Sequence, residues 1–328
     1  MRKRQSFCGA WASWTDPLHD PGRDHHIPPM PETANPAETF SDQPLSFTIP
    51  ARDVRGRAVR LDAALDEILA AHNYPAPITL LLAEALVLVT LMGSLLKDEQ
   101  SQVTMQAQTE SGTVKLLVCD FKDGALRGYV DFDRERLAAL GANPSLFALF
   151  GKGFLAITFD MAGKGRYQGI VPLEGETLGE ACQNYFIQSE QVPTLIRTAV
   201  QTHGASAEAA GMLLQHLPEG EEGRERLHVQ LDHPEWEHVA ILANTVRHEE
   251  LLDESLSLEA IVWRLFHEED EVRIAAGQAV FRGCRCTAEH YETVLSKFPE
   301  ADRAEMRDDN GIITVDCAFC SRTFPIAA

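Results

Sequence analysis

Apolar and polar residues alternate in the central part of the chain. Residues 103–107 alternate strictly, and the apolar stretches after them are joined by short turns that contain glycine. Alternation of this kind is typical of strands with one buried face, and short glycine turns join antiparallel neighbours. The pattern predicts antiparallel strands over 103–107, 113–119, 126–132, 153–160 and 166–171.

Apolar residues at helical spacing surround these strands. They predict helices over 61–71, 78–96 and 178–189. Helices around antiparallel strands define an α+β fold. The helix over 78–96 is the most apolar stretch, but Glu84 lies in its middle. We therefore expect a buried core helix and no membrane span.

A later region, 228–270, is helical and heavily charged. Its apolar residues are Trp236, Val239, Ala240, Ala243 and Val246, followed after the helix cap Ser257 by Leu258, Ile261, Val262 and Leu265. Each set forms only a narrow stripe, so the helices depend on whatever they pack against. Two interpretations stay open: a linker that folds only conditionally, and an ordinary pair of surface helices.

The N-terminal residues 1–42 are rich in proline and poor in branched apolar side chains, which predicts a disordered tail. Histidines and aspartates over 19–26 could chelate a metal, but a flexible segment fixes no ligand geometry. The basic residues at 2–4 resemble the start of a signal peptide, yet the apolar run after them is very short. We expect a protein that remains in the cytoplasm.

The charge balance is acidic, with 29 Lys and Arg against 49 Asp and Glu and a net charge of −20. Such a surface repels nucleic-acid phosphates. The basic residues of 284–328 are scattered among acids and form no dominant basic face. We therefore expect no nucleic-acid partner, and a zinc module that binds nucleic acid is disfavoured.

Four of the seven cysteines lie in the last 45 residues. Cys284 and Cys286 form a C-x-C pair, and Cys317 and Cys320 form a C-x-x-C pair after 30 intervening residues. Two close pairs supply four thiolates in a tetrahedron, the arrangement that Zn²⁺ takes in closed sites. The sequence predicts one zinc ion bound by these four residues in the reduced state.

The C-x-C spacing and its surroundings favour a reactive centre, although a purely structural zinc site remains an alternative. In an extended segment Cys284 and Cys286 point to the same side, with Cα atoms roughly 6.5 Å apart. A disulfide between them would be strained and easily reduced. Arg285 and the helix that we expect after Cys286 both favour thiolate over thiol.

The consequence of oxidation follows from the size of the C-terminal region. Its ~50 residues are too few to fold comfortably on an apolar core alone. Zinc ligation contributes roughly 10–16 kcal/mol in small domains of this kind. Oxidation of all four ligands would release the metal and unfold the region, and a linker helix leaning on it would lose its support. The pattern therefore predicts a redox switch that exposes apolar surface.

The other cysteines and the histidines carry less information. We expect Cys119 and Cys182 to be packed and inert, Cys8 to lie in the tail, and His248 and His267 to be solvated. The sequence contains no P-loop, dinucleotide fingerprint or Ser-His-Asp order, so no catalytic residue is nominated and no enzyme is expected.

One enzymatic alternative stays open, a thiol-disulfide oxidoreductase that uses Cys317 and Cys320. Such enzymes place C-x-x-C after a strand in a βαβ unit, and this C-terminus lacks that pattern. A catalytic rate of insulin reduction would support the alternative.

With these motifs in hand, the chain resembles the heat-shock protein 33 family of redox-regulated chaperones. Both cysteine pairs and their 30-residue gap are similar to that family's zinc centre. The other matching segments are 166–169, 173–178, 185–194, 210–215 and 265–269. The resemblance extends from about residue 44 to 326.

The resemblance implies an ATP-independent holdase that is inactive when reduced and zinc-bound. Oxidation is expected to form the disulfides Cys284–Cys286 and Cys317–Cys320, release zinc and unfold the linker. The activated form is expected to dimerise, bind unfolding client proteins and pass them to ATP-dependent chaperones.

The resemblance also implies a division of the chain into an α+β core domain for client binding and dimerisation, a metastable helical linker and a zinc-binding redox switch. These parts are expected after the tail 1–42, at 43–225, 226–276 and 277–328. One departure is an extra residue before the first pair, Gly283, which we expect to loosen the approach to the metal.

Overall fold

The computed structural model describes residues 41–327, except for 97, 164, 204–205 and 218–232. The predicted tail over 1–42 therefore lies almost wholly outside the described residues. Its last residue, Asp42, is part of the ordered fold. The Asp42 carboxylate accepts hydrogen bonds from the backbone N–H groups of Asp62 and Ala64, both at 3.0 Å. Asp42 thereby fixes the start of the helix α2, Ala63–Leu69.

A six-stranded sheet contains all of the predicted strands. Its order is β11-β5-β4-β3-β6-β7, and all neighbours are antiparallel except β11, which runs parallel to β5. The α+β class and the predicted antiparallel strands are confirmed. The strands are β3 Gln102–Thr109, β4 Val114–Lys122, β5 Ala125–Phe132, β6 Gly153–Met161, β7 Gly165–Pro172 and β11 Phe281–Arg282.

A second, five-stranded sheet was not predicted. Its order is β10-β1-β2-β9-β8, with antiparallel neighbours throughout. The central strand β2 is buried along its whole length, although it contains three arginines. Because of these three charges, the sequence of β2 does not show the apolar pattern of a buried strand. The strands are β1 Leu45–Ile49, β2 Val54–Leu61, β8 Thr194–His203, β9 Ser206–His216 and β10 Arg273–Ala276.

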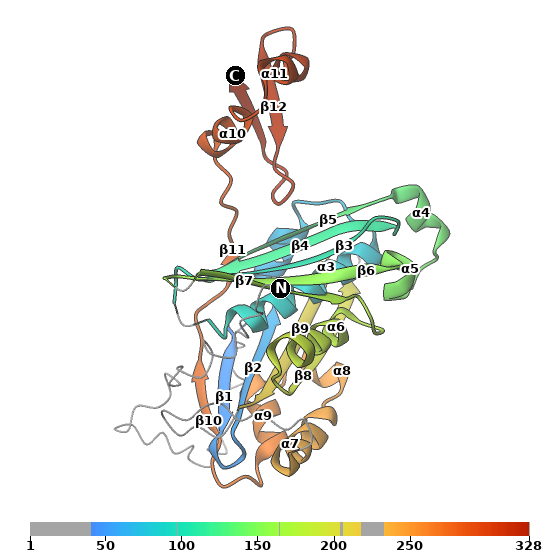
Figure 1. The fold of residues 1–328 in the computed structure, drawn as a ribbon. Helices are drawn as coiled ribbons and strands as arrows, with labels where there is room; N and C mark the ends of the chain where they lie inside the picture. Colours follow the sequence, from blue (N-terminus) through green and yellow to red (C-terminus); the bar gives the residue numbers. More distant parts are fainter. Residues whose placement is uncertain (1–40, 97, 164, 204–205, 218–232, 328) are drawn as a thin grey trace, which may run out of the picture.

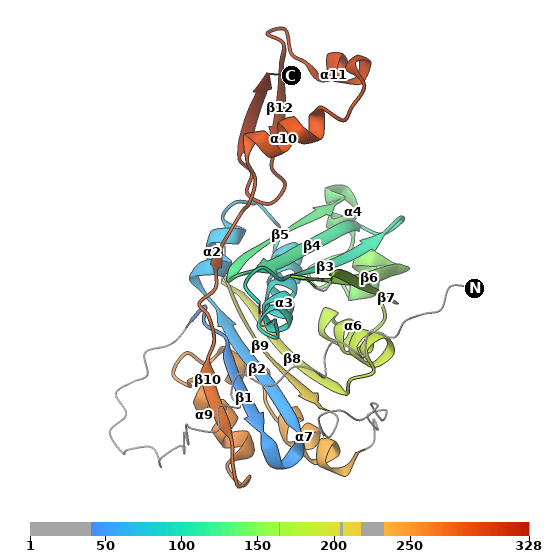
Figure 2. The same cartoon turned by 60° about the vertical axis from the view of Figure 1, so that its left-hand side comes forward.

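The helix α3, Ala76–Gly93, packs against strands of both sheets (Figure 2). It is long and apolar enough to cross a membrane, but 78% of the apolar segment is buried inside the fold. Its apolar side chains form the centre of the main hydrophobic core, as expected for a core helix. Shorter helices are η1 Pro50–Arg52, α4 Arg134–Ala139, α5 Leu146–Phe150, α6 Leu178–Tyr185 and the π-helical turn η2 Phe186–Glu190.

The charged region after residue 232 forms three helices on the outer face of the five-stranded sheet. They are α7 Pro234–Asn244, α8 His248–Leu252 and α9 Leu258–Phe266. Most residues of the predicted apolar stripes, including Val239, Ala243 and Val262, are buried against β1, β2 and β9 in a second hydrophobic cluster. Phe266, which the predicted stripe did not include, is fully buried in the same cluster, whereas Leu265 is only partly buried. The helices therefore pack on the core sheet. They do not pack on the cysteine region, which is the C-terminal part of the chain from Cys284 onward and lies at the opposite end of the molecule (Figures 1 and 2).

The segment between α9 and the cysteines runs along the edges of both sheets. First β10 pairs with β1, and then β11 pairs with β5. The C-terminal region follows as a small unit with its own apolar cluster of Leu295, Ile313 and Ile326. Its elements are α10 Ala288–Leu295, α11 Glu300–Met306, β12 Ile312–Asp316 and β13 Thr323–Ala327.

Candidate metal centre

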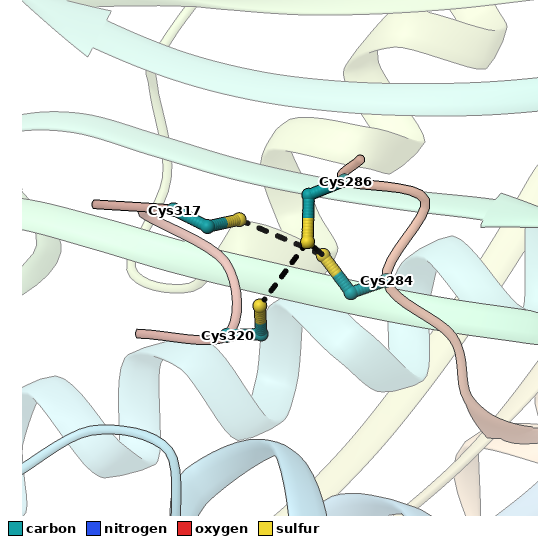
Figure 3. Close-up of side chains that lie close together, drawn as sticks. All are labelled: Cys284, Cys286, Cys317 and Cys320. Carbon is teal, nitrogen blue, oxygen red and sulfur yellow. Dashed lines mark hydrogen bonds between the residues drawn. The ribbon is translucent and has the colours of Figure 1, made fainter. Parts of the chain in front are cut away.

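The four predicted cysteines meet at one point. Their sulfur atoms all lie within 4.8 Å of one another (Figure 3). The Sγ–Sγ distances are 3.3 Å for Cys284–Cys286, 3.6 Å for Cys284–Cys317 and 3.4 Å for Cys286–Cys320. Cys284 is half-buried and the other three are buried. This group of thiols could hold a metal ion.

The first cysteine pair follows directly after β11. The backbone N–H of Gly283 donates to the Leu126 carbonyl at 2.9 Å. A Cβ atom on residue 283 would lie only 2.3 Å from that of Ala125. The expectation that Gly283 loosens this approach is therefore wrong, because the missing side chain lets the backbone lie close against β5. After the pair, the expected helix α10 begins, and the Thr287 hydroxyl caps it by accepting from the His290 N–H.

The second pair occupies the turn of the hairpin formed by β12 and β13. The Cys317 N–H donates to the Arg322 carbonyl at 2.9 Å, and the Ser321 N–H donates to the Cys317 carbonyl at 2.8 Å. Ser321 has a φ of 56°, in the left-handed region. This tight turn brings the sulfurs of Cys317 and Cys320 to the same side (Figure 3).

The thiols differ in how readily they ionise. Burial raises the pKa of Cys286 to about 12, and thiol hydrogen bonds with Cys284 and Cys320 add to the rise. Burial also tends to raise the pKa of Cys320, but hydrogen bonds from the backbone and side chain of Arg322 outweigh it and lower this pKa to about 6. Four neighbouring thiols cannot all ionise without a compensating cation. A bound divalent metal supplies that charge.

The arginines that interact with the sulfurs, Arg322 with Cys286 and Arg127 with Cys284, are not the one that the sequence indicated. Nη2 of Arg322 donates to the Cys286 sulfur at 3.3 Å. Arg285, which we expected to favour the thiolates, instead pairs with Asp120 of β4. Arg322 lies two positions after Cys320, and this spacing was the available sequence signal. The sequence carried no signal for Asp120, which lies 165 positions from Arg285.

The cysteines predicted to be inert are buried in the core. Cys119 and Cys182 are both 0% exposed, and burial raises the pKa of each thiol. Cys182 lies 3.7 Å from the Met105 sulfur. His248 and His267 are exposed, as expected. Cys8 and the histidines of the tail lie outside the described residues.

Comparison with known proteins decides the family. The model of the family described as Hsp33 protein matches residues 42–327. The 33 kDa chaperonin of Caulobacter vibrioides is 38% identical over 306 residues, which cover 90% of this chain and 98% of the relative. The chain belongs to the Hsp33 family. The predicted resemblance is thus confirmed.

Two further comparisons also match most of the length of this Hsp33 chain. The 33 kDa chaperonin of Pseudomonas aeruginosa is 36% identical over 293 residues, which cover 87% of this chain and 92% of the relative. The crystal structure of the 33 kDa chaperonin of Thermotoga maritima is similar with a TM-score of 0.69, covering 87% of this chain and 94% of that one. Its sequence identity is 20%, so this likeness concerns the fold alone.

Proposed function

We propose that this Hsp33 protein is a cytoplasmic, redox-regulated holdase chaperone that needs no ATP. The observation that carries the proposal is the cluster of Cys284, Cys286, Cys317 and Cys320, whose sulfurs lie within 4.8 Å of one another in a chain of this family. The reduced, metal-bound form is inactive, and oxidation of the four cysteines activates it.

The metal that fits the cluster best is one Zn²⁺ ion. A tetrahedron with Zn–S bonds of about 2.3 Å has sulfurs about 3.8 Å apart, and the closest Sγ–Sγ distances here are 3.3–3.6 Å. Four thiolates are also the donor set typical of structural zinc. Bound there, zinc supplies the positive charge that keeps the four thiols ionised and joins the two cysteine pairs.

Oxidation would remove the ligands in pairs. A peroxide molecule takes two electrons from two thiolates and, with two protons, becomes two water molecules while one S–S bond forms. We propose the pairs Cys284–Cys286 and Cys317–Cys320, so two peroxide molecules oxidise all four ligands. The small apolar cluster of Leu295, Ile313 and Ile326 then has to hold the C-terminal region without the metal, and we expect it to unfold.

The path to the linker runs along the edge of the core. Between the cysteines and α9, the chain is held by the pairing of β11 with β5 and by the Val280 N–H, which donates to the Asp42 carbonyl at 2.6 Å. Pairing of β10 with β1 follows. Unfolding of the C-terminal region would free β11 first, and β10 next.

Two arginines hold the linker helices on the sheet. Arg60 donates to three linker carbonyls, those of Leu251, Asp253 and Leu256, at 2.8–3.2 Å. Arg52 forms ion pairs with Glu235 and Glu269. When the helices leave, an apolar sheet face that includes Phe47, Ile49, Met212 and Leu214 becomes available. We propose that this uncovered surface serves client binding and dimerisation, and that ATP-dependent chaperones receive the clients.

The proposal assigns the parts of the chain as the resemblance implied. Residues 43–225 form the core, 226–276 the metastable linker and 277–328 the redox switch. The switch and the linker each contribute an edge strand to a core sheet, β11 and β10. These strands couple the three parts. The oxidoreductase alternative gains no support, since Cys317 and Cys320 lie in a hairpin turn and not at a helix N-terminus.

The test compares reduced and oxidised protein in the same assay. We expect protein treated with peroxide under mild heating, or with hypochlorous acid, to suppress aggregation of a thermally unfolding client, while reduced protein does not. Released zinc and lost thiols are counted in parallel, with one zinc ion and four thiols expected per chain. A variant with both Cys317→Ser and Cys320→Ser lacks two of the four ligands and cannot form the second disulfide. It therefore separates metal loss from disulfide formation at that pair. Equal inactivity of both forms would remove the holdase proposal, and zinc retained during oxidation would leave a structural zinc protein.

A further inference from the structure

Asp120 occupies an unusual place for a carboxylate on a sheet. Its neighbours in β4, Cys119 and Phe121, point into the main core, so alternation places Asp120 on the outer face. Outer-face carboxylates are normally solvated. Here only 3% of the Asp120 side chain is exposed, because residues of the cysteine region lie over it.

Two arginines pair with this buried carboxylate. Arg127, directly opposite on β5, lies 2.9 Å from Oδ2. Arg285, from the C-terminal region, places Nη2 2.5 Å from Oδ1. A buried charge is costly unless it is paired. The carboxylate therefore holds both arginines, and it ties the core sheet to the cysteine region.

Arg285 lies between Cys284 and Cys286, so its ion pair with Asp120 affects the orientation of both cysteines. In an extended segment, residues i and i+2 point to one side and residue i+1 points to the other. The sulfurs of Cys284 and Cys286 lie 3.3 Å apart at the metal centre, while the Arg285 side chain reaches Asp120. Holding the guanidinium therefore fixes the direction in which both sulfurs point.

The same patch of sheet also contacts the second cysteine pair. Phe319, between Cys317 and Cys320, packs edge-on against Tyr129, with ring centroids 4.9 Å apart at 85°. The Arg127 guanidinium carbon lies 4.1 Å from the centre of the Phe319 ring. Arg127 therefore contacts Asp120 on one side and Phe319 on the other. The core sheet thus positions both halves of the cysteine cluster.

We propose that Asp120 is a positioning residue for the metal centre, which acts through Arg285 to hold the Cys284–Cys286 segment ready for ligation. The inference rests on the zinc centre proposed above and adds that the core sheet sets its affinity. Residues that orient ligands without binding the metal typically change metal affinity about 10–100-fold. The expected effect of removing the ion pair is a loss of that size.

The test measures zinc affinity of full-length, reduced protein by competition with a chromogenic chelator. Asp120→Asn and Arg285→Gln should each weaken zinc binding about 10–100-fold. The double variant should be no weaker than the worse single variant, because both substitutions remove the same interaction. Arg285→Lys, which keeps the charge without the planar fork, should recover part of the loss.

Asp160→Asn is the matched control. It removes an ion pair with Arg166 on the same sheet, where the side chains are 49% and 71% exposed, and it should leave zinc affinity unchanged. Arg285→Gln leaves the core sequence intact, so it answers the question even if Asp120→Asn lowers the stability of the core. Unchanged affinity in Arg285→Gln, or additive losses in the double variant, would overturn the inference. Wild-type protein that binds no zinc would instead overturn the metal centre itself, so the two failures are distinguishable.

Discussion

The core and the C-terminal cysteine region depend on different sources of stability. In the core, α3 residues such as Leu82 and Leu86 are fully buried between two sheets, and each buried Å² of apolar surface contributes about 25 cal/mol. The apolar cluster of the C-terminal region contains Leu295, Ile313 and Ile326 as its buried members. Packing therefore determines the stability of the core, whereas in the function proposed above the state of four sulfurs determines that of the cysteine region.

Helices α7–α9, which we propose as the linker, lie on a core sheet, but the chain connects them to the proposed redox switch. They cover a core sheet, yet the chain that leaves them passes through β10 and β11 to the cysteines. Stability in this part should therefore respond to changes on either side. The predictions below test whether the three parts separate in this way.

The largest effect should come from removing the metal. Chelation of reduced protein withdraws a contribution of roughly 10–16 kcal/mol, so we expect residues 284–327 to lose their amide-exchange protection. Strands β3 to β5 should remain protected, because apolar packing and not the metal holds them. Mass-resolved hydrogen exchange with and without chelator measures both. Protection retained over 284–327 after metal loss would show that the apolar cluster suffices by itself.

A cavity in the core should give the opposite pattern. Leu86→Ala removes a side chain with 0% exposure between the two sheets, which should lower the free energy of unfolding by about 2–5 kcal/mol. Zinc affinity should stay unchanged, since Leu86 belongs to the main core cluster and the four cysteines to a separate one. Urea titration followed by far-UV circular dichroism measures the stability, and chelator competition measures the affinity. A large change in affinity would mean that the core and the metal centre are not separable.

The parts also differ in how far their sequence predicted them. The strands over 103–171 were predictable because they alternate and end in glycine turns. The five-stranded sheet was missed because Arg55, Arg57 and Arg60 interrupt the apolar pattern of β2, although partners within the fold let them be buried. A local sequence pattern cannot show that a charged side chain will be buried when its hydrogen-bond acceptor lies far away along the chain.

At the cysteine cluster, too, the features that depend on neighbouring residues were predictable, and those that depend on distant residues were not. That Cys284, Cys286, Cys317 and Cys320 lie together was predictable from their spacing as two close pairs. The apolar stripes of 228–270 indicated most of the buried residues, although not Phe266, and they did not indicate that β1, β2 and β9 bury them. Asp120 had no local signature, because only the folded sheet brings it to Arg285.

A smaller effect should come from removing the arginine that binds the linker helices to the core sheet. Arg60→Met leaves the carbonyls of Leu251, Asp253 and Leu256 without this donor, which should cost about 1–3 kcal/mol. We expect faster amide exchange in α8 and α9 with unchanged zinc affinity, and activation at a lower dose of oxidant. Arg166→Met, at an exposed position of the other sheet, is the control. If exchange in these helices stayed at the wild-type rate, Arg60 would not hold the linker.

The smallest effect concerns the pH dependence of core stability. Burial raises the pKa of Glu84 above its ordinary value of 4.5, although hydrogen bonds from the Gly179 N–H and the Thr198 hydroxyl partly oppose the rise. The folded state therefore binds this proton more tightly than the unfolded state does. Its stabilising contribution is fully present below pH 4.5 and is lost as pH rises through the folded pKa.

Glu84→Gln keeps an oxygen acceptor but cannot ionise, so its stability should gain on the wild type as pH rises above 4.5. The difference should level off once wild-type Glu84 is ionised in the folded state. Urea midpoints of both proteins over a pH series measure this difference, and Glu190, whose pKa is also raised mainly by burial, cancels because both proteins contain it. Parallel curves would mean that the Glu84 carboxyl is as easily ionised in the core as in water. In that case the core would tolerate a charge within α3 itself, and the contrast between the core and the cysteine cluster would be weaker than the packing suggests.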